Sequence, residues 1–169
     1  MNSFLERFSI RRMMLEDVEQ VHQLDVLSFS LPWPERSFRY ELTKNPASRM
    51  WVVEEHSEEP GKNVIGMLGL WLIVDEVHIG TLAVHPDYRK QGIAQKLLIA
   101  SLREACKEGA AKTYLEVRKG NLAAQALYTK FGFKISGIRP RYYSDNGEDA
   151  LMMTLEPMRA EDLVRFSER

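Results

Sequence analysis

The sequence predicts an α/β or α+β domain built on a mixed sheet. Short segments rich in β-branched residues are interleaved with segments that repeat apolar residues every three or four positions, as helices inserted among strands do. A chain of 169 residues, of which 44% are hydrophobic and 28% charged, has the size and composition of a globular domain with one core. We therefore expect one domain over residues 1–157, followed by a polar helical tail over residues 158–169.

The first elements are expected to be a strand from Phe8 to Met13 and a helix from Leu15 to Phe29. The apolar residues of this helix recur on a three-residue step, at Val18, Val21, Leu24 and Leu27. Pro34 can open a second helix that runs to about Lys44, because proline is well accommodated in the first turn of a helix.

Three strands are expected next, at Met50–Glu54, Val64–Val74 and Val77–Val84. The polar segment from Glu55 to Asn63 is expected to be the first connection between them, and Asp75-Glu76 a tight hairpin turn.

The second half of the chain is expected to begin with a helix from Gly92 to Glu108 that ends at Gly109. Its inward-facing residues are Ile93, Leu97, Leu98, Leu102, Ala105 and Cys106. The remaining elements are a strand at Thr113–Val117, a helix at Asn121–Phe131 and closing strands at Phe133–Ile138 and Ala150–Leu155.

The charge distribution argues against nucleic acid as a partner. The 23 Lys and Arg residues and 24 Asp and Glu residues are interleaved and give a net charge of -1, so no basic stripe forms. The histidines at positions 78 and 85 have no cysteine or histidine at ligand spacing, so we expect no metal.

We expect a cytoplasmic protein without a membrane segment. Residues Met1 to Ile10 lack the apolar core of a secretory signal, and the longest apolar stretch, Val64 to Val74, is too short to span a bilayer as a helix. A single cysteine, Cys106, cannot form an internal disulfide, and we give it no nucleophilic role. We expect a monomer or weak dimer.

The segment between Val84 and the helix after it has the composition of an anion site. Backbone N–H groups at a helix start have no partner within the helix and lie at the positive end of its dipole. Arg89 and Lys90 add positive charge, and Gly92 lets a ligand approach the backbone. Taken alone, the same residues fit an ordinary helix start equally well.

Two sets of residues resemble a known family. Arg89, Gly92 and Ala94 resemble the R/Q-x-x-G-x-G/A signature of the GNAT superfamily of N-acetyltransferases, with Ala94 where glycine is commoner. A second set resembles the RimI branch, the ribosomal-protein alanine N-acetyltransferases, and comprises Leu115 to Asn121, Ala126-Leu127-Tyr128, Phe131-Gly132-Phe133, Arg141-Tyr142-Tyr143 and Glu148-Asp149-Ala150.

The resemblance implies the GNAT fold, a splayed mixed sheet of about six to seven strands flanked by about four helices. It implies acetyl-CoA as the co-substrate, held between two central strands that part. Backbone groups of Leu82, Ala83 and Val84 would bind its acetyl and pantetheine parts, and Asn121 would bind near the thioester, although Asn121 can equally be the N-cap of the following helix. The diphosphate would be held by Arg89, Lys90, Gln91, Gly92, Ile93, Ala94 and Gln95.

The resemblance assigns Glu116 as the general base and Tyr128 as the general acid. The attacking amine must lose a proton, which a general base accepts, and the departing thiolate must gain one, which a general acid donates. The residues alone leave two alternatives open: a surface carboxylate that pairs with Arg118 or Lys119, and a half-buried aromatic side chain.

The acceptor implied by the resemblance is the N-terminal amine of a protein, most directly the N-terminal alanine of a ribosomal protein. An α-amine is about one-tenth neutral at pH 7, whereas a lysine is neutral about once in 2,500 molecules, a gap of roughly 3.5 kcal/mol. A single carboxylate base therefore suits an N-terminus better than a lysine. The alternatives are a small-amine acetyltransferase, acting on a polyamine or an antibiotic, and a non-catalytic acyl-CoA-binding module.

The groove for this acceptor is expected to be walled by Trp33, Tyr142 and Tyr143, which lie in loops that flank the acceptor in the family. These aromatic residues can also simply pack the loops that carry them. Acidic residues at positions 58, 59, 145 and 149 could attract a basic peptide or form only a solvated surface.

Overall fold

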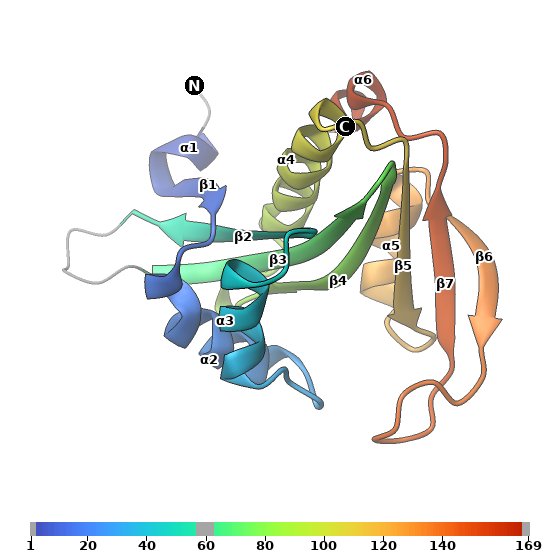
Figure 1. Ribbon diagram of the computed structural model, residues 1–169, viewed down its shortest axis with the longest axis horizontal. Coiled ribbons are helices and arrows are strands. Elements are labelled where there is room, and N and C mark those ends of the chain that lie inside the picture. The colour runs from blue at the N-terminus through green and yellow to red at the C-terminus, as the bar shows by residue number, and fades with distance from the viewer. Residues whose placement is uncertain (1–2, 57–62, 167–169) are drawn as a thin grey trace. The chain divides into compact units, whose positions relative to one another are not determined.

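The computed structural model describes residues 3–56 and 63–166. Its strands form a seven-stranded mixed sheet in the order β1-β2-β3-β4-β5-β7-β6 (Figure 1), which confirms the mixed sheet expected from the sequence. The chain divides into two compact units. The first unit contains the described residues of 3–70 together with 81–101, and the second contains 71–80 and 102–166.

The first unit carries the N-terminal elements and parts of three longer ones. Its complete elements are α1 (Ser3–Arg7), β1 (Phe8–Arg12), the 3-10 helix η1 (Leu15–Asp17), α2 (Val18–Ser28), α3 (Glu35–Thr43), β2 (Ser48–Glu55) and the 3-10 helix η2 (Pro86–Tyr88). The longer ones are β3 (Asn63–Ile73), β4 (Glu76–Val84) and α4 (Ile93–Lys107), which continue into the second unit. Strand β1 pairs antiparallel with β2, from Phe8 opposite Glu55 to Arg12 opposite Trp51.

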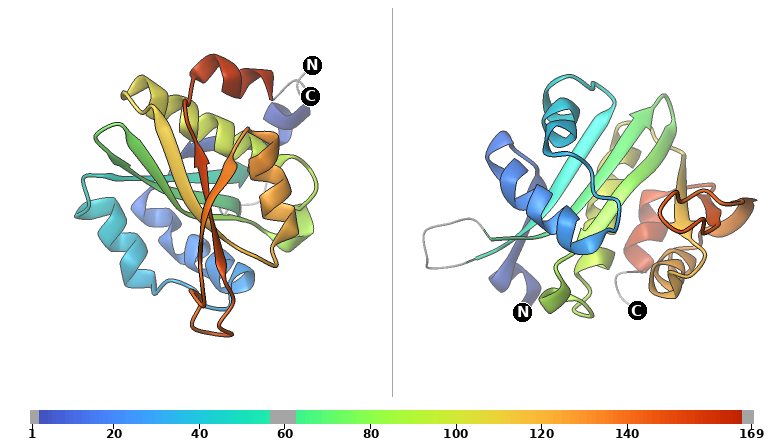
Figure 2. Two further views of the ribbon diagram at one scale, coloured as in Figure 1. Left: turned by 90° about the vertical axis from the view of Figure 1, so that its right-hand side faces the viewer. Right: turned by 90° about the horizontal axis from the view of Figure 1, so that it is seen from below.

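The core of the first unit lies between the sheet and the helix pair α2 and α3. These helices contact each other and cover the same face of β2 (Figure 2). Val18, Val21 and Leu24 are buried against Met50 and Phe38, as their spacing predicts. Leu27, the last residue of the three-residue step, is 58% exposed. Nine residues at about 100° each place Leu27 half a turn away from Val18.

A buried ion pair fixes the connection from β1 to α2. Asp17 is fully buried and accepts two hydrogen bonds from Arg11, at 2.7 and 2.9 Å, and a third from the backbone N–H of Met14 at 2.8 Å. Both oxygens of the Asp17 carboxylate are therefore paired when the unit is folded.

We expect Asp17→Ala to lower the free energy of unfolding by about 3 kcal/mol, because it removes the buried acceptor of the Met14 N–H and of two Arg11 donors. Arg11 then keeps only part of its pairing, with Glu54. Urea denaturation measures this value. The matched control is Glu35→Ala, which removes an exposed i,i+4 pair with Arg39 and is expected to cost less than about 0.5 kcal/mol. Equal costs for the two variants would show that the buried pair does not stabilise the turn.

The second unit contains the remaining elements: β5 (Lys112–Arg118), α5 (Leu122–Lys130), β6 (Lys134–Arg139), β7 (Ala150–Leu155) and α6 (Ala160–Arg165). Strand β4 pairs parallel with β5 from Glu76 opposite Lys112 to Ile79 opposite Leu115. From Thr113 to Arg118, β5 pairs antiparallel with β7, which pairs antiparallel with β6.

The positions of the elements depart from the sequence prediction in a few places. The hairpin turn is Val74-Asp75, one residue earlier than expected; Val74 adopts a positive φ of 58°, and Glu76 already belongs to β4. Helix α1 was not predicted. Most of the expected Glu55–Asn63 connection, residues 57–62, lies outside the described residues.

The described C-terminal residues, 158–166, are part of the second unit. Met158 and Leu163 are buried, and Met158 accepts a hydrogen bond from Thr113 at 2.9 Å. Cys106 is partly buried, and this burial raises the pKa of its thiol. Within residues 3–56 and 63–166, no helix has the length and apolarity needed to cross a membrane.

Candidate functional site

The loop between β4 and α4 has the backbone conformation of an anion-binding turn. Lys90 and Gly92 adopt positive φ angles of 63° and 75°, shortly before α4 begins at Ile93. Successive N–H groups in such left-handed turns converge on a concave surface that suits an anion, and the start of α4 adds the positive end of its dipole. At Gly92 a Cβ atom would meet nothing within 4 Å, so it is the φ angle that favours glycine there.

Arg89 is held at the start of this loop. Its Nε donates to the carbonyl oxygen of Val84 at 3.1 Å, which ties the loop to the end of β4. Because this bond uses Nε, the two terminal amino groups of the guanidinium can still face an anion. Lys90 and Gln91 are exposed next to it.

The end of β4 offers backbone groups rather than side chains. Ala83 and Val84 are buried, and the Ala83 side chain belongs to the core of the first unit with α2 and α3. The N–H of His85 is already paired with the carbonyl of Ile65 at 2.8 Å. Any ligand that binds at Leu82, Ala83 and Val84 would therefore contact main-chain atoms.

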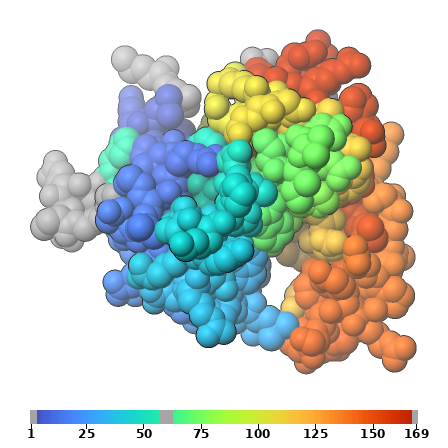
Figure 3. All heavy atoms as spheres, in the orientation of Figure 1, coloured from blue at the N-terminus to red at the C-terminus, as the bar shows by residue number. Residues whose placement is uncertain are grey.

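Trp33 lies in the segment between α2 and α3, which forms a continuous part of the surface with these helices (Figure 3, blue to cyan). Its ring is partly buried against Phe38, with ring centroids 5.4 Å apart. The backbone N–H of Trp33 donates to the carboxylate of Asp25 at 2.6 Å, and burial raises the pKa of this carboxyl. Trp33 thus has a packing role, and its role in acceptor binding stays a prediction.

Glu116 lies on β5 in the second unit. Its neighbours Leu115 and Val117 are buried on one face of the strand, so alternation turns Glu116 to the other face. The Glu116 side chain is 34% exposed, and its carboxylate forms an ion pair with Arg139 of β6 at 3.3 Å. It is therefore accessible to solvent and to an incoming cation.

Tyr128 lies on α5 and is 6% exposed, with its ring packed on Phe133 at 5.5 Å. Burial raises the pKa of its hydroxyl, so the phenol keeps its proton throughout the neutral range. The helix begins with Asn121 as its N-cap, whose side-chain oxygen accepts from the N–H of Ala124 at 3.1 Å. The capping role expected for Asn121 is confirmed, and its cofactor role stays a prediction.

Tyr143 interacts electrostatically with both Glu116 and Tyr128. Its hydroxyl has a pKa raised chiefly by burial, and the charge of Glu116 contributes in the same direction. Tyr143 also contributes to the raised pKa of Tyr128. Glu116 and Tyr128 therefore both lie within electrostatic range of one tyrosine, while Tyr142 packs edge-on against Tyr143 at 5.1 Å and is 49% exposed.

A clamp that the sequence did not reveal holds the loop carrying the two tyrosines. The guanidinium of Arg118 bonds Asp145 at 2.8 Å and Glu148 at 3.1 Å, and it stacks on the Tyr143 ring at 3.8 Å. Glu148 also accepts from the N–H of Gly120 at 2.6 Å, and a Cβ at Gly120 would lie only 2.7 Å from that oxygen. The clamp thus joins the loop to the turn that begins α5.

Two of the acidic residues expected to attract a basic peptide form ion pairs or hydrogen bonds within the protein. Asp145 pairs with Arg118, and Asp149 accepts from the N–H of Arg141 at 2.9 Å and lies 3.8 Å from the amine of Lys119. Their charges are thus largely balanced locally. Positions 58 and 59 lie outside the described residues.

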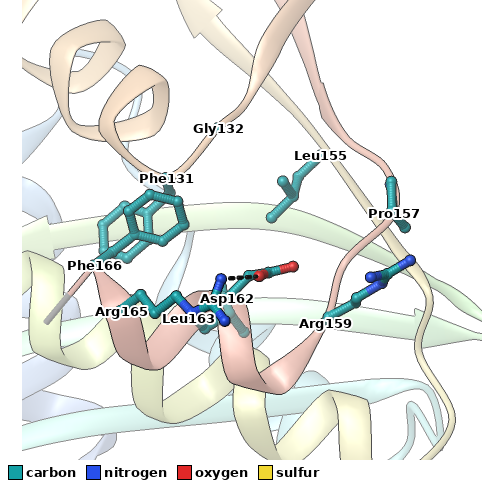
Figure 4. A pocket seen from close by; sticks show the side chains of 9 residues that line it. All are labelled: Phe131, Gly132, Leu155, Pro157, Arg159, Asp162, Leu163, Arg165 and Phe166. Atoms are coloured by element: carbon teal, nitrogen blue, oxygen red, sulfur yellow. Dashed lines mark ion pairs between the residues drawn. The ribbon is translucent and has the colours of Figure 1, made fainter.

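A hollow in the second unit is lined by residues other than those of the candidate site (Figure 4). It encloses about 290 Å³ next to α6, where Asp162 and Arg165 form an ion pair at 3.7 Å. Its described lining is Phe131, Gly132, Leu155, Pro157, Arg159, Asp162, Leu163, Arg165 and Phe166, which includes none of the predicted site residues.

Comparison with known proteins identifies the family. Residues 18–133 match the model of the acetyltransferase (GNAT) family. The chain therefore belongs to the GNAT family of acetyltransferases, as the motif at Arg89 to Ala94 indicates.

Among its relatives is a Bacillus subtilis protein provisionally named a ribosomal protein bS18-alanine N-acetyltransferase, 40% identical over 86% of this chain and 93% of that protein. The crystal structure of the Escherichia coli ribosomal-protein-S18-alanine N-acetyltransferase is 28% identical, with a TM-score of 0.78, over 90% of this chain and 95% of that one. A chain of the NatC complex, solved with Gag peptide and CoA, is 26% identical with a TM-score of 0.79, over 90% of this chain and 99% of that one.

Proposed function

We propose that this protein transfers the acetyl group of acetyl-CoA directly to the N-terminal amine of a protein, with an N-terminal alanine of a ribosomal protein as the leading acceptor. The observation that carries the proposal is the grouping of Glu116, Tyr128 and Tyr143 in the second unit. A carboxylate that can take a proton and a phenol that can give one lie within electrostatic range of the same tyrosine. Aminolysis of a thioester needs one group of each kind.

The residues of the β4–α4 loop fit the diphosphate of coenzyme A. The left-handed Lys90 and Gly92 present backbone N–H groups, and Arg89 is held with its terminal amino groups available. Main-chain atoms of residues 82–84 suit the acetyl and pantetheine parts, because their side chains are largely buried. When bound, acetyl-CoA supplies the activated thioester, and the diphosphate contacts determine where its reactive carbon lies.

Glu116 is the proposed general base. The acceptor arrives as an ammonium ion, and the partly exposed carboxylate attracts this charge in competition with the guanidinium of Arg139. Glu116 then takes the proton of the amine, directly or through water. Because an α-amine needs only a modest base, one carboxylate is sufficient.

Tyr128 is the proposed acid. Its burial keeps the hydroxyl protonated, so the donor is always in the correct state, but the same burial makes it a weaker acid. Its contribution is therefore a hydrogen bond to the departing thiolate, followed by transfer of the proton as charge develops on sulfur.

The acceptor side is proposed to be the loop that carries Tyr142 and Tyr143, with Trp33 as a further contact. Tyr142 is the exposed member of the pair, and the clamp of Arg118 fixes its orientation through Tyr143. A preordered loop lowers the entropy cost of binding a flexible peptide end. The activities for which the Bacillus and Escherichia relatives are named support a protein N-terminus as the acceptor.

Initial rates with a panel of amines test this proposal. The panel contains a peptide that begins with alanine, the same peptide with a blocked N-terminus and an internal lysine, and free spermidine. We expect turnover only of the free α-amine, with the acetyl group located there by mass spectrometry. Turnover of spermidine with inert peptides would establish the small-amine alternative, and binding of CoA without turnover of any amine would establish the non-catalytic one.

A further inference from the structure

The carboxylate of Glu55, the last residue of β2, accepts hydrogen bonds from three separate segments of the first unit. It accepts from the hydroxyl of Tyr88 at 2.5 Å, from the guanidinium of Arg7 at 3.0 Å and from the amide of Asn63 at 3.3 Å. Tyr88 belongs to η2 and directly precedes Arg89. The group therefore links β2 and α1 to the entrance of the β4–α4 loop.

The ring of Tyr88 is anchored as well as its hydroxyl. It packs edge-on against Phe8 at 6.3 Å and against His85 at 5.7 Å. Phe8 is buried and adjoins Phe4, whose ring is covered by the amine of Lys96 in the first turn of α4 at 5.0 Å. Contacts of the N-terminal segment therefore reach both ends of the loop.

The pKa shifts of Glu55 and Tyr88 favour the hydrogen bond between them at neutral pH. The hydrogen bond from Tyr88, followed by that from Arg7, lowers the pKa of the Glu55 carboxyl, and the same bond raises the pKa of the Tyr88 hydroxyl. At neutral pH the carboxylate is thus an acceptor and the phenol a donor. Charge-assisted hydrogen bonds of this kind are among the stronger ones in proteins.

We propose that Tyr88 and Glu55 are positioning residues that hold the β4–α4 loop in its diphosphate-binding conformation. The loop needs such support because Lys90, a non-glycine residue, is left-handed, and a conformation of this kind persists only where its surroundings impose it. The downstream end of the loop is fixed by α4, and the upstream end by the bond of Arg89 to Val84 and by the Tyr88–Glu55 bond. This inference rests on the proposed binding of coenzyme A.

Calorimetric titration with coenzyme A tests the inference on the whole protein. We expect Tyr88→Phe and Glu55→Leu each to weaken binding about tenfold, the size of one charge-assisted hydrogen bond. Glu55→Gln keeps a side-chain oxygen that can accept from Tyr88 and should restore binding to within about twofold of the wild type. The control is Tyr40→Phe, which removes the same hydroxyl from an exposed position on α3 and should leave the affinity unchanged.

Two further measurements distinguish a positioning role of Tyr88 and Glu55 from a general destabilisation of the fold. The double variant Tyr88→Phe/Glu55→Leu should bind no more weakly than Glu55→Leu alone, because Glu55→Leu already removes the bond to Tyr88. In steady-state kinetics the KM for acetyl-CoA should rise about tenfold, whereas kcat at saturating acetyl-CoA and the KM for the peptide should stay at the wild-type values.

Each possible failure has a distinct meaning. Wild-type protein that binds no coenzyme A would refute the proposed function itself. Wild-type protein that binds normally, with Tyr88→Phe equally tight or with additive losses in the double variant, would refute the positioning role alone. A fall in kcat with an unchanged KM for acetyl-CoA would also refute it.

Discussion

Replacing Glu116 with glutamine should lower kcat about 10²- to 10³-fold for a peptide with a free N-terminal alanine, with little change in the KM for acetyl-CoA. Glutamine keeps the shape of the side chain but cannot take a proton, so the acceptor must lose its proton to solvent. Steady-state rates at pH 7 measure the effect. The matched control, Glu104→Gln, removes a carboxylate from an exposed pair with Lys107 and should leave kcat unchanged.

The loss of rate caused by Glu116→Gln should become smaller as the pH rises. As the pH rises above about 8, the α-amine of the peptide loses its proton without help, so the ratio of wild-type to variant rates should narrow. A ratio near one at pH 7, or one that widens with pH, would show that Glu116 is not the base.

The second large effect is expected for Tyr128→Phe, which should lower kcat about 10²-fold. The substitution removes only the hydroxyl, and the phenyl ring can keep its contact with Phe133, so the thermal unfolding midpoint should barely change. The matched control is Tyr114→Phe, whose ring stacks on His78 elsewhere in the second unit. Equal rates for the two variants would remove Tyr128 from the mechanism.

Burial also predicts how the Tyr128 hydroxyl behaves at high pH. Because its pKa is raised, the phenol stays protonated to a higher pH than free tyrosine does, and the acid remains present as the pH increases. Any alkaline decline of the wild-type rate below about pH 10 should therefore persist in Tyr128→Phe. An alkaline limb that disappears in the variant would contradict this assignment.

The sequence predicted the elements whose signal is local. The strands and the helix over Ile93 to Lys107 were visible because apolar residues recur at the period of each structure over many positions. Leu27 continues the apolar step but lies outside the core, because a three-residue step drifts around a helix that needs 3.6 residues per turn. The turn at Val74-Asp75 slipped by one residue because a positive φ at valine has no composition signal.

The supporting contacts of the site could not be predicted in the same way. Arg118 and Glu148 are 30 residues apart, and Glu55 and Tyr88 are 33 apart, so each pair forms only when distant segments fold together. The residues with a proposed chemical role were assigned through the family resemblance. The same motifs contain Arg118 and Glu148 but do not show that these two side chains pair, and Glu55 and Tyr88 lie in no motif. The ion pair of Glu116 with Arg139 likewise joins residues that are distant in the sequence.

A crystal structure with a bisubstrate analogue, in which coenzyme A is joined to the N-terminus of a peptide that begins with alanine, tests the central claim most directly. The account predicts that the Glu116 carboxylate lies within about 3.2 Å of the former α-amine or of one bridging water, and that the Tyr128 hydroxyl lies within a similar distance of the sulfur. A complex in which either side chain lies beyond the reach of a hydrogen bond or a single water would contradict it.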